Sequence, residues 1–153
     1  MRTSKKLLVE QLDRKIKPFQ GTENTIIPER GWINNIRLAL NMTLEQLGNK
    51  LNITRQGAKR IEESEAAGSI SIKSMKEIGE HLNMKFVYGY VPYDGSIDNL
   101  INRKAEELAK KIVLRTNQNM KLENQGNSED TITRAIKDLT IELKREMNKS
   151  LWD

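Results

Sequence analysis

The chain has 153 residues, 37% hydrophobic and 31% charged, with a net charge of +5. This length is typical of one domain with a modest core and some appended elements. The absence of cysteine excludes disulfides, thiolate chemistry and Cys-based zinc sites. No apolar run approaches the length of about 18 residues that a membrane helix needs, and no signal peptide opens the chain. We therefore expect a cytoplasmic protein.

The first predicted element is a helix over residues 4–17, ended by Pro18. Leu8, Leu12 and Ile16 recur at helical spacing and form its expected apolar stripe. The opposite face is basic, which fits a solvated surface on a packed arm or, alternatively, an additional contact with DNA phosphates. With the polar linker behind this helix, residues 1–29 are predicted to form an N-terminal helical arm and linker.

Two short helices joined by a tight turn are predicted between residues 42 and 62. Thr43–Gln46 has the T-x-x-Q form of a capping box, and leucines follow at helical spacing. Asn52 tolerates the left-handed conformation that ends a helix, and Thr54 can cap the next one. Such a pattern is typical of a helix-turn-helix. The outward residues of its second helix are Arg55, Gln56, Lys59 and Arg60.

Positive charge is concentrated in the same region. From Arg30 to Arg60 there are six basic residues and a single acid, a surplus of five charges that equals the surplus of the whole chain. A basic run is often only a solvated face. Here it coincides with the predicted second helix, which favours a nucleic-acid partner.

The expected roles at a DNA site follow from side-chain reach. Arg55 and Gln56 begin the recognition helix and point at base edges, since Arg reads guanine and Gln reads adenine; Arg60 lies one turn further on and reaches a base or a phosphate. Expected phosphate contacts come from helix N-termini and a lysine, namely Thr43, Leu44, Gln46, Thr54 and Lys59.

Two more helices complete the predicted DNA-binding domain, residues 30–83. The first has Trp32, Ile36 and Leu40 as its inner stripe, and the last is capped by Ser71 and runs to Leu82. The single histidine has no cluster of acidic residues around it, so we expect neither a metal site nor a cofactor.

Residues 84–92 are predicted to form one β-strand, because they are aromatic and β-branched and Pro92 ends them. No second strand is apparent, so we expect pairing between two copies in a homodimer, or alternatively cover from the chain's own C-terminal helix. The residues of this dimer strand are Phe86, Val87, Tyr88, Tyr90 and Val91.

Residues 93–153 are predicted to form a helical extension for dimer or partner binding. Ile101, Ala105, Leu108 and Ile112 form one stripe, and a second runs from Ile132 to Met147. An Asn-rich polar segment separates the two.

Residues 42–62 resemble the lambda-repressor-like, XRE-type helix-turn-helix of phage repressors and antitoxins. More of the chain resembles the mobile mystery protein A family. The segments in which this second resemblance is found are LLVEQLDRKIKPF, RGWINNIRLALNMTLEQLGNKL, EESEAAGSISIKSM, FVYGYVP and the terminal LWD. These resemblances imply a mainly α protein: a lambda-repressor-like helix-turn-helix bundle with one short dimerising β-strand and extra N- and C-terminal helices.

The resemblances also imply site residues and a partner. In lambda-repressor-like domains the positions matching Arg37 and Glu62 form an internal ion pair. The family implies a regulator carried beside a Fic-domain toxin. Antitoxins of such toxins inhibit through S/T-x-x-x-E-G/N, and Glu123 with Asn124 is a near match that has Asn119 in place of the hydroxyl residue. An exposed loop glutamate is the alternative interpretation of Glu123.

No nucleotide-binding glycine pattern or paired-carboxylate signature occurs in the sequence, so we expect a protein that is not an enzyme. The predicted function is sequence-specific DNA binding at a palindromic operator by an autorepressing, antitoxin-like regulator. The alternatives are a stand-alone transcriptional repressor, and a pure toxin-neutralising module in which the helix-turn-helix no longer binds DNA.

Overall fold

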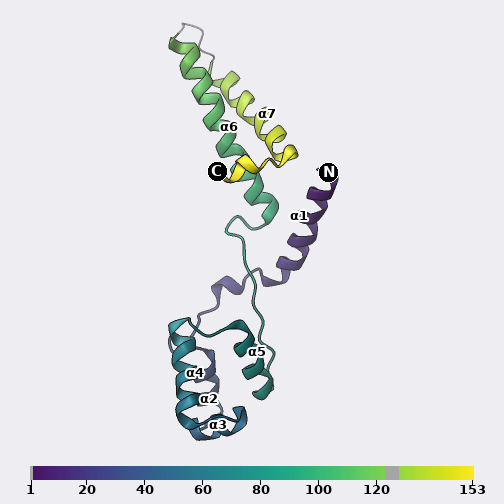
Figure 1. Cartoon of the computed structure of the whole chain (residues 1–153). Helices are drawn as coiled ribbons and strands as arrows, with labels where there is room; N and C mark the ends of the chain where they lie inside the picture. The colour runs from purple at the N-terminus through teal and green to yellow at the C-terminus, as the bar shows by residue number, and fades with distance from the viewer. Residues whose placement is uncertain (1, 123–127) are drawn as a thin grey trace. The chain divides into compact units, whose positions relative to one another are not determined.

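The computed structural model describes residues 2–122 and 128–153 and is mainly helical (Figure 1). The α-helices of the described residues are α1 (Arg2–Ile16), α2 (Trp32–Ala39), α3 (Leu44–Leu51), α4 (Arg55–Ala67), α5 (Ile72–His81), α6 (Ile97–Leu122) and α7 (Glu129–Glu146). Short 3-10 turns are η1 (Lys17–Phe19), η2 (Thr22–Asn24) and η3 (Lys149–Trp152). The chain forms two compact units, Asn24–Tyr88 and Met1–Glu23 with Gly89–Asp153.

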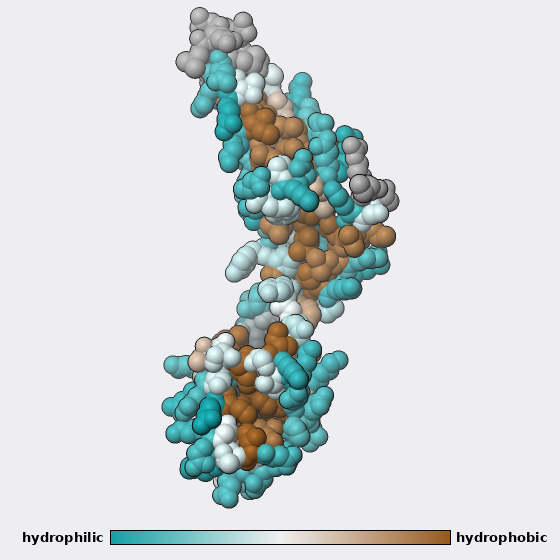
Figure 2. All heavy atoms as spheres, in the orientation of Figure 1, coloured by the Kyte–Doolittle hydropathy of each residue, from teal (hydrophilic) through white to brown (hydrophobic). Residues whose placement is uncertain are grey.

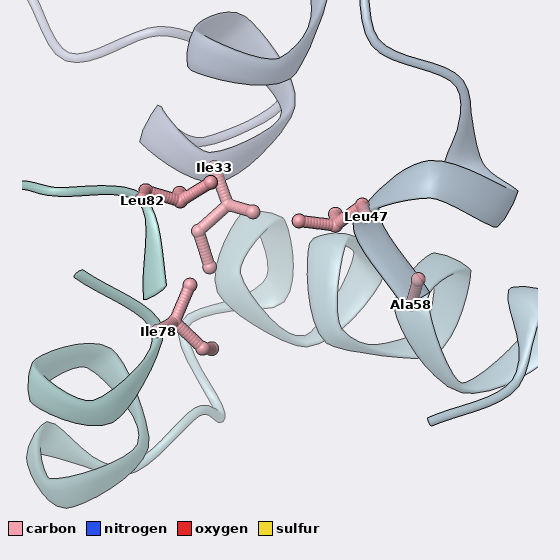
Figure 3. Packing of buried hydrophobic residues seen from close by; sticks show 5 residues of the cluster. All are labelled: Ile33, Leu47, Ala58, Ile78 and Leu82. Carbon is pink, nitrogen blue, oxygen red and sulfur yellow. The ribbon is translucent and has the colours of Figure 1, made fainter. Parts of the chain in front are cut away.

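Helices α2 to α5 of the unit Asn24–Tyr88 enclose one apolar core. Figure 3 shows its five buried residues, contributed by every helix of the unit and by the residue that follows α5: Ile33, Leu47, Ala58, Ile78 and Leu82. The side chain of Leu47 is fully buried, and α3 packs closely on α4. The prediction for α5 is confirmed, since Ser71 caps it and Ile78 and Leu82 are buried.

The inner stripe of α2 differs from the prediction. Trp32 and Leu40 are 37% and 53% exposed, whereas Ile33 is only 3% exposed. Ile36 packs against the core as predicted. The helix is rotated about its axis relative to the prediction, because a polar residue, Arg37, also faces inward. A stripe drawn through apolar residues alone does not include Arg37.

The other unit is built on a helical hairpin in which α6 packs along α7 (Figure 1). Its core contains Ile101, Ala105 and Leu151, with Val9 and Leu143 packed around them. The chain leaves α7 at Met147, whose φ of 48° is left-handed, and η3 then returns Leu151 to α6.

Helix α1 belongs to this unit and is not a separate arm. Asp13 accepts hydrogen bonds from the backbone N–H groups of Ile97 (2.7 Å) and Asp98 (3.3 Å) at the start of α6. Val9 packs inward, while Leu8 is 65% and Leu12 43% exposed. The predicted apolar stripe is therefore one position out of register, because the polar Asp13 occupies the inner face.

Truncating Leu151 to alanine tests whether the chain end is part of this core. Leu151 is 5% exposed, and a buried Leu→Ala change costs about 2–5 kcal/mol of the free energy of unfolding. We expect a loss in this range by urea denaturation followed by circular dichroism. Leu114→Ala on α6 is the matched control, since Leu114 is 46% exposed and its truncation should cost far less. Equal losses in the two variants would contradict this packing.

Exposed ion pairs also occur in this unit. Arg103 donates to Asp94 at 2.8 Å and to Glu107 at 2.7 Å. The hydrogen bond with Asp94 is the main cause of the raised pKa of Arg103. The hydrogen bond from Arg103 is in turn the main cause of the lowered pKa of Glu107. Such exposed pairs contribute little to stability because water and salt screen them.

Residues 84–92 do not form a strand in the single chain, and no strand occurs elsewhere among the described residues. A strand is defined by hydrogen bonding to a neighbouring strand, and the backbone of Lys85–Val91 makes no hydrogen bond to any other described residue. Cover of the segment by the chain's own C-terminal helix, the alternative, is not tested by these hydrogen bonds. Pairing between two copies stays a prediction.

Within the described ranges, no helix combines the length and apolarity needed to cross a membrane.

Candidate nucleic-acid interface

Helix α4 presents a polar and basic outer face. Its four outward side chains are exposed, namely Arg55, Gln56, Lys59 and Arg60. The inward positions Ala58 and Glu62 are buried, so the helix is amphipathic. A solvated face with two arginines, a lysine and an amide presents only donors and one acceptor, which suits a polyanion.

The N-termini of α3 and α4 are both capped by threonine. Thr43 accepts from the Gln46 N–H at 3.1 Å and Gln46 accepts from the Thr43 N–H at 2.9 Å, which is the predicted capping box. Thr54 accepts from the Gly57 N–H at 3.0 Å. Each threonine still has its hydroxyl proton, and Gln46 its amide N–H₂, to donate to an external acceptor. The Leu44 N–H, in the first turn of α3, has no acceptor among the described residues.

The turn between the helices depends on a close approach at Gly48. Asn52 ends α3 with a φ of 57°, and the Ile53 N–H donates back to the Gly48 carbonyl at 2.9 Å. A Cβ at position 48 would lie 2.9 Å from the Ile53 carbonyl oxygen and 3.0 Å from that of Thr54. The missing side chain thus lets the turn pack directly on α3.

Replacing Gly48 with alanine should destabilise the unit. Alanine gains about 1 kcal/mol of helix propensity, but overpacking against backbone costs about 1–3 kcal/mol, so we expect a net loss near 1 kcal/mol. Asn49→Ala on the exposed side of α3 is the control. The midpoint of urea denaturation should fall for Gly48→Ala and not for the control; a higher midpoint for Gly48→Ala would contradict the close approach.

Gly57, in the first turn of α4, is half-buried rather than open to the outer face. A Cβ there would lie 3.3 Å from the Thr54 hydroxyl oxygen and 3.4 Å from the Ile53 Cβ. The residue therefore contributes space around the N-cap, and the outer face begins with Arg55 and Gln56.

The inner face of α4 is held by the ion pair between Arg37 and Glu62. Their side chains are 12% and 8% exposed, and the Arg37 Nε to Glu62 Oε2 distance is 2.5 Å. Arg37 also donates to Glu62 Oε1 at 3.2 Å and to the Met42 carbonyl at 2.9 Å. Asn34 donates to the same carboxylate at 2.8 Å. The expected pair is thus present, with both carboxylate oxygens and three guanidinium donors engaged.

One turn further along α4, Glu65 caps α2. Its carboxylate accepts from the backbone N–H groups of Trp32 at 2.7 Å and Ile33 at 2.8 Å. Gly31 precedes them with a φ of 90°, and a Cβ there would lie 2.7 Å from the Glu65 carboxyl carbon. Two glutamates of α4 therefore fix both the start and the middle of α2.

The sequence-predicted residues of the site are brought together only in part. The capping residues and the basic side chains lie on α3 and α4, as expected. Sequence reasoning missed Asn34 and Glu65; the spacing of Glu62 and Glu65 places them on one face of α4, a signal that was available. Glu123 and Asn124 lie outside the described residues.

Comparisons of the chain with protein-family models, with curated proteins and with solved structures find no match. Over the described residues, no group of three or more potential metal-binding side chains comes together.

Proposed function

We propose that the unit Asn24–Tyr88 is a lambda-repressor-like helix-turn-helix domain that binds double-stranded DNA in a sequence-specific manner. The observation that carries the proposal is the exposed basic outer face of α4 on a helix whose inner face is fixed by a buried ion pair. A recognition helix needs both properties, because its side chains must enter the major groove in one defined orientation.

The roles divide along α4 and the start of α3. Arg55 and Gln56, in the first turn of α4, read base edges, and Arg60 reaches a base or a phosphate. Lys59 binds a phosphate. The capped N-termini at Thr43 and Thr54 offer hydroxyl protons, and the Leu44 N–H lacks an acceptor among the described residues; these groups fit phosphate oxygens.

The DNA-bound form is a homodimer on a palindromic operator, with half-sites about 34 Å apart. Two copies supply two recognition helices, and the apolar segment 84–92 supplies the contact between them. This geometry predicts that binding depends on the spacing of the half-sites as well as on their sequence.

We further propose that the chain represses its own promoter as the antitoxin-like partner of a Fic-domain toxin. This step depends on the resemblance of segments such as Arg30–Leu51 and Phe86–Pro92 to the mobile mystery protein A family. Co-purification of the chain with the product of the adjacent reading frame tests it. A chain that purifies alone and still represses would be a stand-alone repressor.

The DNA-binding proposal is tested by an electrophoretic shift assay with the DNA upstream of the chain's own reading frame, against a scrambled duplex of the same length. We expect a shift of the upstream DNA at concentrations that leave the scrambled duplex free. Binding that is equal for the two duplexes at every salt concentration would contradict sequence-specific recognition.

A further inference from the structure

The backbone of Lys85–Val91 makes no hydrogen bond to any described residue of the chain. The two ends of this unpaired segment are clearly defined. Just before it, the Met84 N–H donates to the Gly79 carbonyl at 2.7 Å, and just after it Pro92 has no N–H to donate. Such a row of free donors and acceptors is a template for strand addition.

The same segment borders an apolar groove in the unit Asn24–Tyr88. The groove has a volume of about 290 Å³ and runs between α2, α5 and residues 84–87. Trp32, Met75 and Phe86 are among its lining residues. Figure 2 shows hydrophobic atoms reaching the surface of this unit between hydrophilic margins. In the single chain, Val87 is 63%, Tyr88 55% and Tyr90 87% exposed.

Side-chain alternation along the segment is already visible. The rings of Phe86 and Tyr88 are stacked, with centroids 6.1 Å apart and planes 21° apart, which places both on one face. Lys76 of α5 holds its ammonium 5.2 Å from the centre of the Tyr88 ring. At the next residue, which belongs to the other unit, a Cβ at Gly89 would lie 2.9 Å from the ring of Phe19, so that ring covers the glycine.

Symmetry restricts how two copies of this segment can pair. A two-fold axis between antiparallel strands is perpendicular to their sheet. A residue of one strand and the residue directly across from it in the partner strand therefore have their side chains on the same face of the sheet. The axis must therefore lie at the level of one residue, which pairs with its own copy in the partner, and not midway between two consecutive residues. Tyr88 is the midpoint of Lys85–Val91, and only an axis there pairs every residue of the free row.

The pairing about Tyr88 also matches side chains. It sets Phe86 opposite the partner's Tyr90, and Val87 opposite the partner's Gly89. Cross-strand aromatic pairs stabilise a sheet, and a β-branched residue opposite glycine leaves room for the Phe19 ring. The segment is thus complementary to itself, which favours a second copy over an unrelated strand.

We propose that a second copy of this chain closes the groove. The segments 85–91 of two copies form an antiparallel ribbon centred on Tyr88, and the partner's Tyr90 lies over Phe86 at the mouth of the groove. This inference extends the homodimer of the proposed function by giving its register and the residue that covers Trp32. The groove is incomplete in one copy and complete in two.

Because the chain has no cysteine, single-cysteine variants report the register directly. In this register Tyr88→Cys faces its own copy at a distance that permits a disulfide. Lys85→Cys is the matched control, because two such residues would be about 20 Å apart along the ribbon. We expect air oxidation of dilute protein to give a covalent dimer for Tyr88→Cys and none for Lys85→Cys on a non-reducing gel. Faster dimerisation of Val87→Cys would overturn the register.

A second measurement needs no introduced cysteine. In a Trp152→Phe background Trp32 is the single tryptophan, and its emission reports cover of the groove. We expect emission to shift to longer wavelength when the protein is diluted below its dimerisation constant, and to do so at every concentration for Tyr90→Ala. Unchanged emission in both experiments would overturn the proposal.

The ribbon and the DNA-binding proposal can be contradicted independently of each other. A chain that is monomeric in sedimentation while it shifts its upstream DNA would overturn the ribbon and leave DNA binding in place. A covalent Tyr88→Cys dimer that shifts no DNA would support the ribbon and contradict the DNA-binding proposal.

Discussion

Replacing Arg55, Lys59 and Arg60 together by alanine should abolish sequence-specific DNA binding at moderate salt. Each lost bidentate arginine contact costs about 1–3 kcal/mol, so we expect the affinity for the upstream DNA to fall by about a hundredfold or more. The slope of log affinity against log salt should also become less steep by about 0.9 for each phosphate contact removed. An electrophoretic shift assay repeated at several salt concentrations measures both quantities.

A charge-matched control separates these local contacts from net charge. Lys110→Ala, Lys111→Ala and Arg115→Ala together remove the same charge from exposed positions of α6, in the other unit. We expect this control to bind nearly as tightly as the parent. Equal weakening of the two variants would mean that α4 acts only through overall charge, and an unaffected α4 variant would remove the basis for the proposed function.

Breaking the ion pair between Arg37 and Glu62 should destabilise the unit Asn24–Tyr88 severely. The side chains are nearly buried, and Arg37 and Asn34 are the hydrogen-bond partners of the Glu62 carboxylate, so Arg37→Ala would remove its charged partner. Loss of one partner of a buried pair costs about 3–5 kcal/mol. Urea denaturation followed by Trp32 emission, in the Trp152→Phe background, reports this unit specifically.

Two variants test this interpretation. Replacing both partners by leucine removes the unpaired charge, so the double variant should be more stable than Arg37→Ala, because a buried pair exchanged for apolar side chains is often neutral. Arg103→Ala breaks an exposed pair in the other unit and should leave the Trp32 transition unchanged. A double variant no more stable than Arg37→Ala would show that the pair contributes packing and not charge compensation.

The sequence was most informative where a local rule decides the conformation. Thr43, Thr54 and Ser71 were expected as N-caps and each accepts the backbone N–H three residues on, and Asn52 is left-handed as expected. Caps and turns depend on a few adjacent residues, so one sequence suffices to predict them.

Apolar stripes were less reliable where a polar residue points inward. Asp13 on α1 and Arg37 on α2 both occupy inner faces, and in each case the predicted stripe was rotated away from the observed one. Periodicity assigns polar residues to solvent by default, so it cannot detect one whose partners lie far along the chain. The docking of α1 on α6 had no sequence signal for the same reason.

The division of α4 into two faces has a consequence for engineering. Ala58, Glu62 and Glu65 face inward and hold the scaffold, while Arg55, Gln56, Lys59 and Arg60 make no hydrogen bond or ion pair through their side chains to the described residues. Exchange of those four positions for other good helix formers should cost little in folding. Under the proposed function, libraries randomised there should therefore yield well-folded variants with new target sequences.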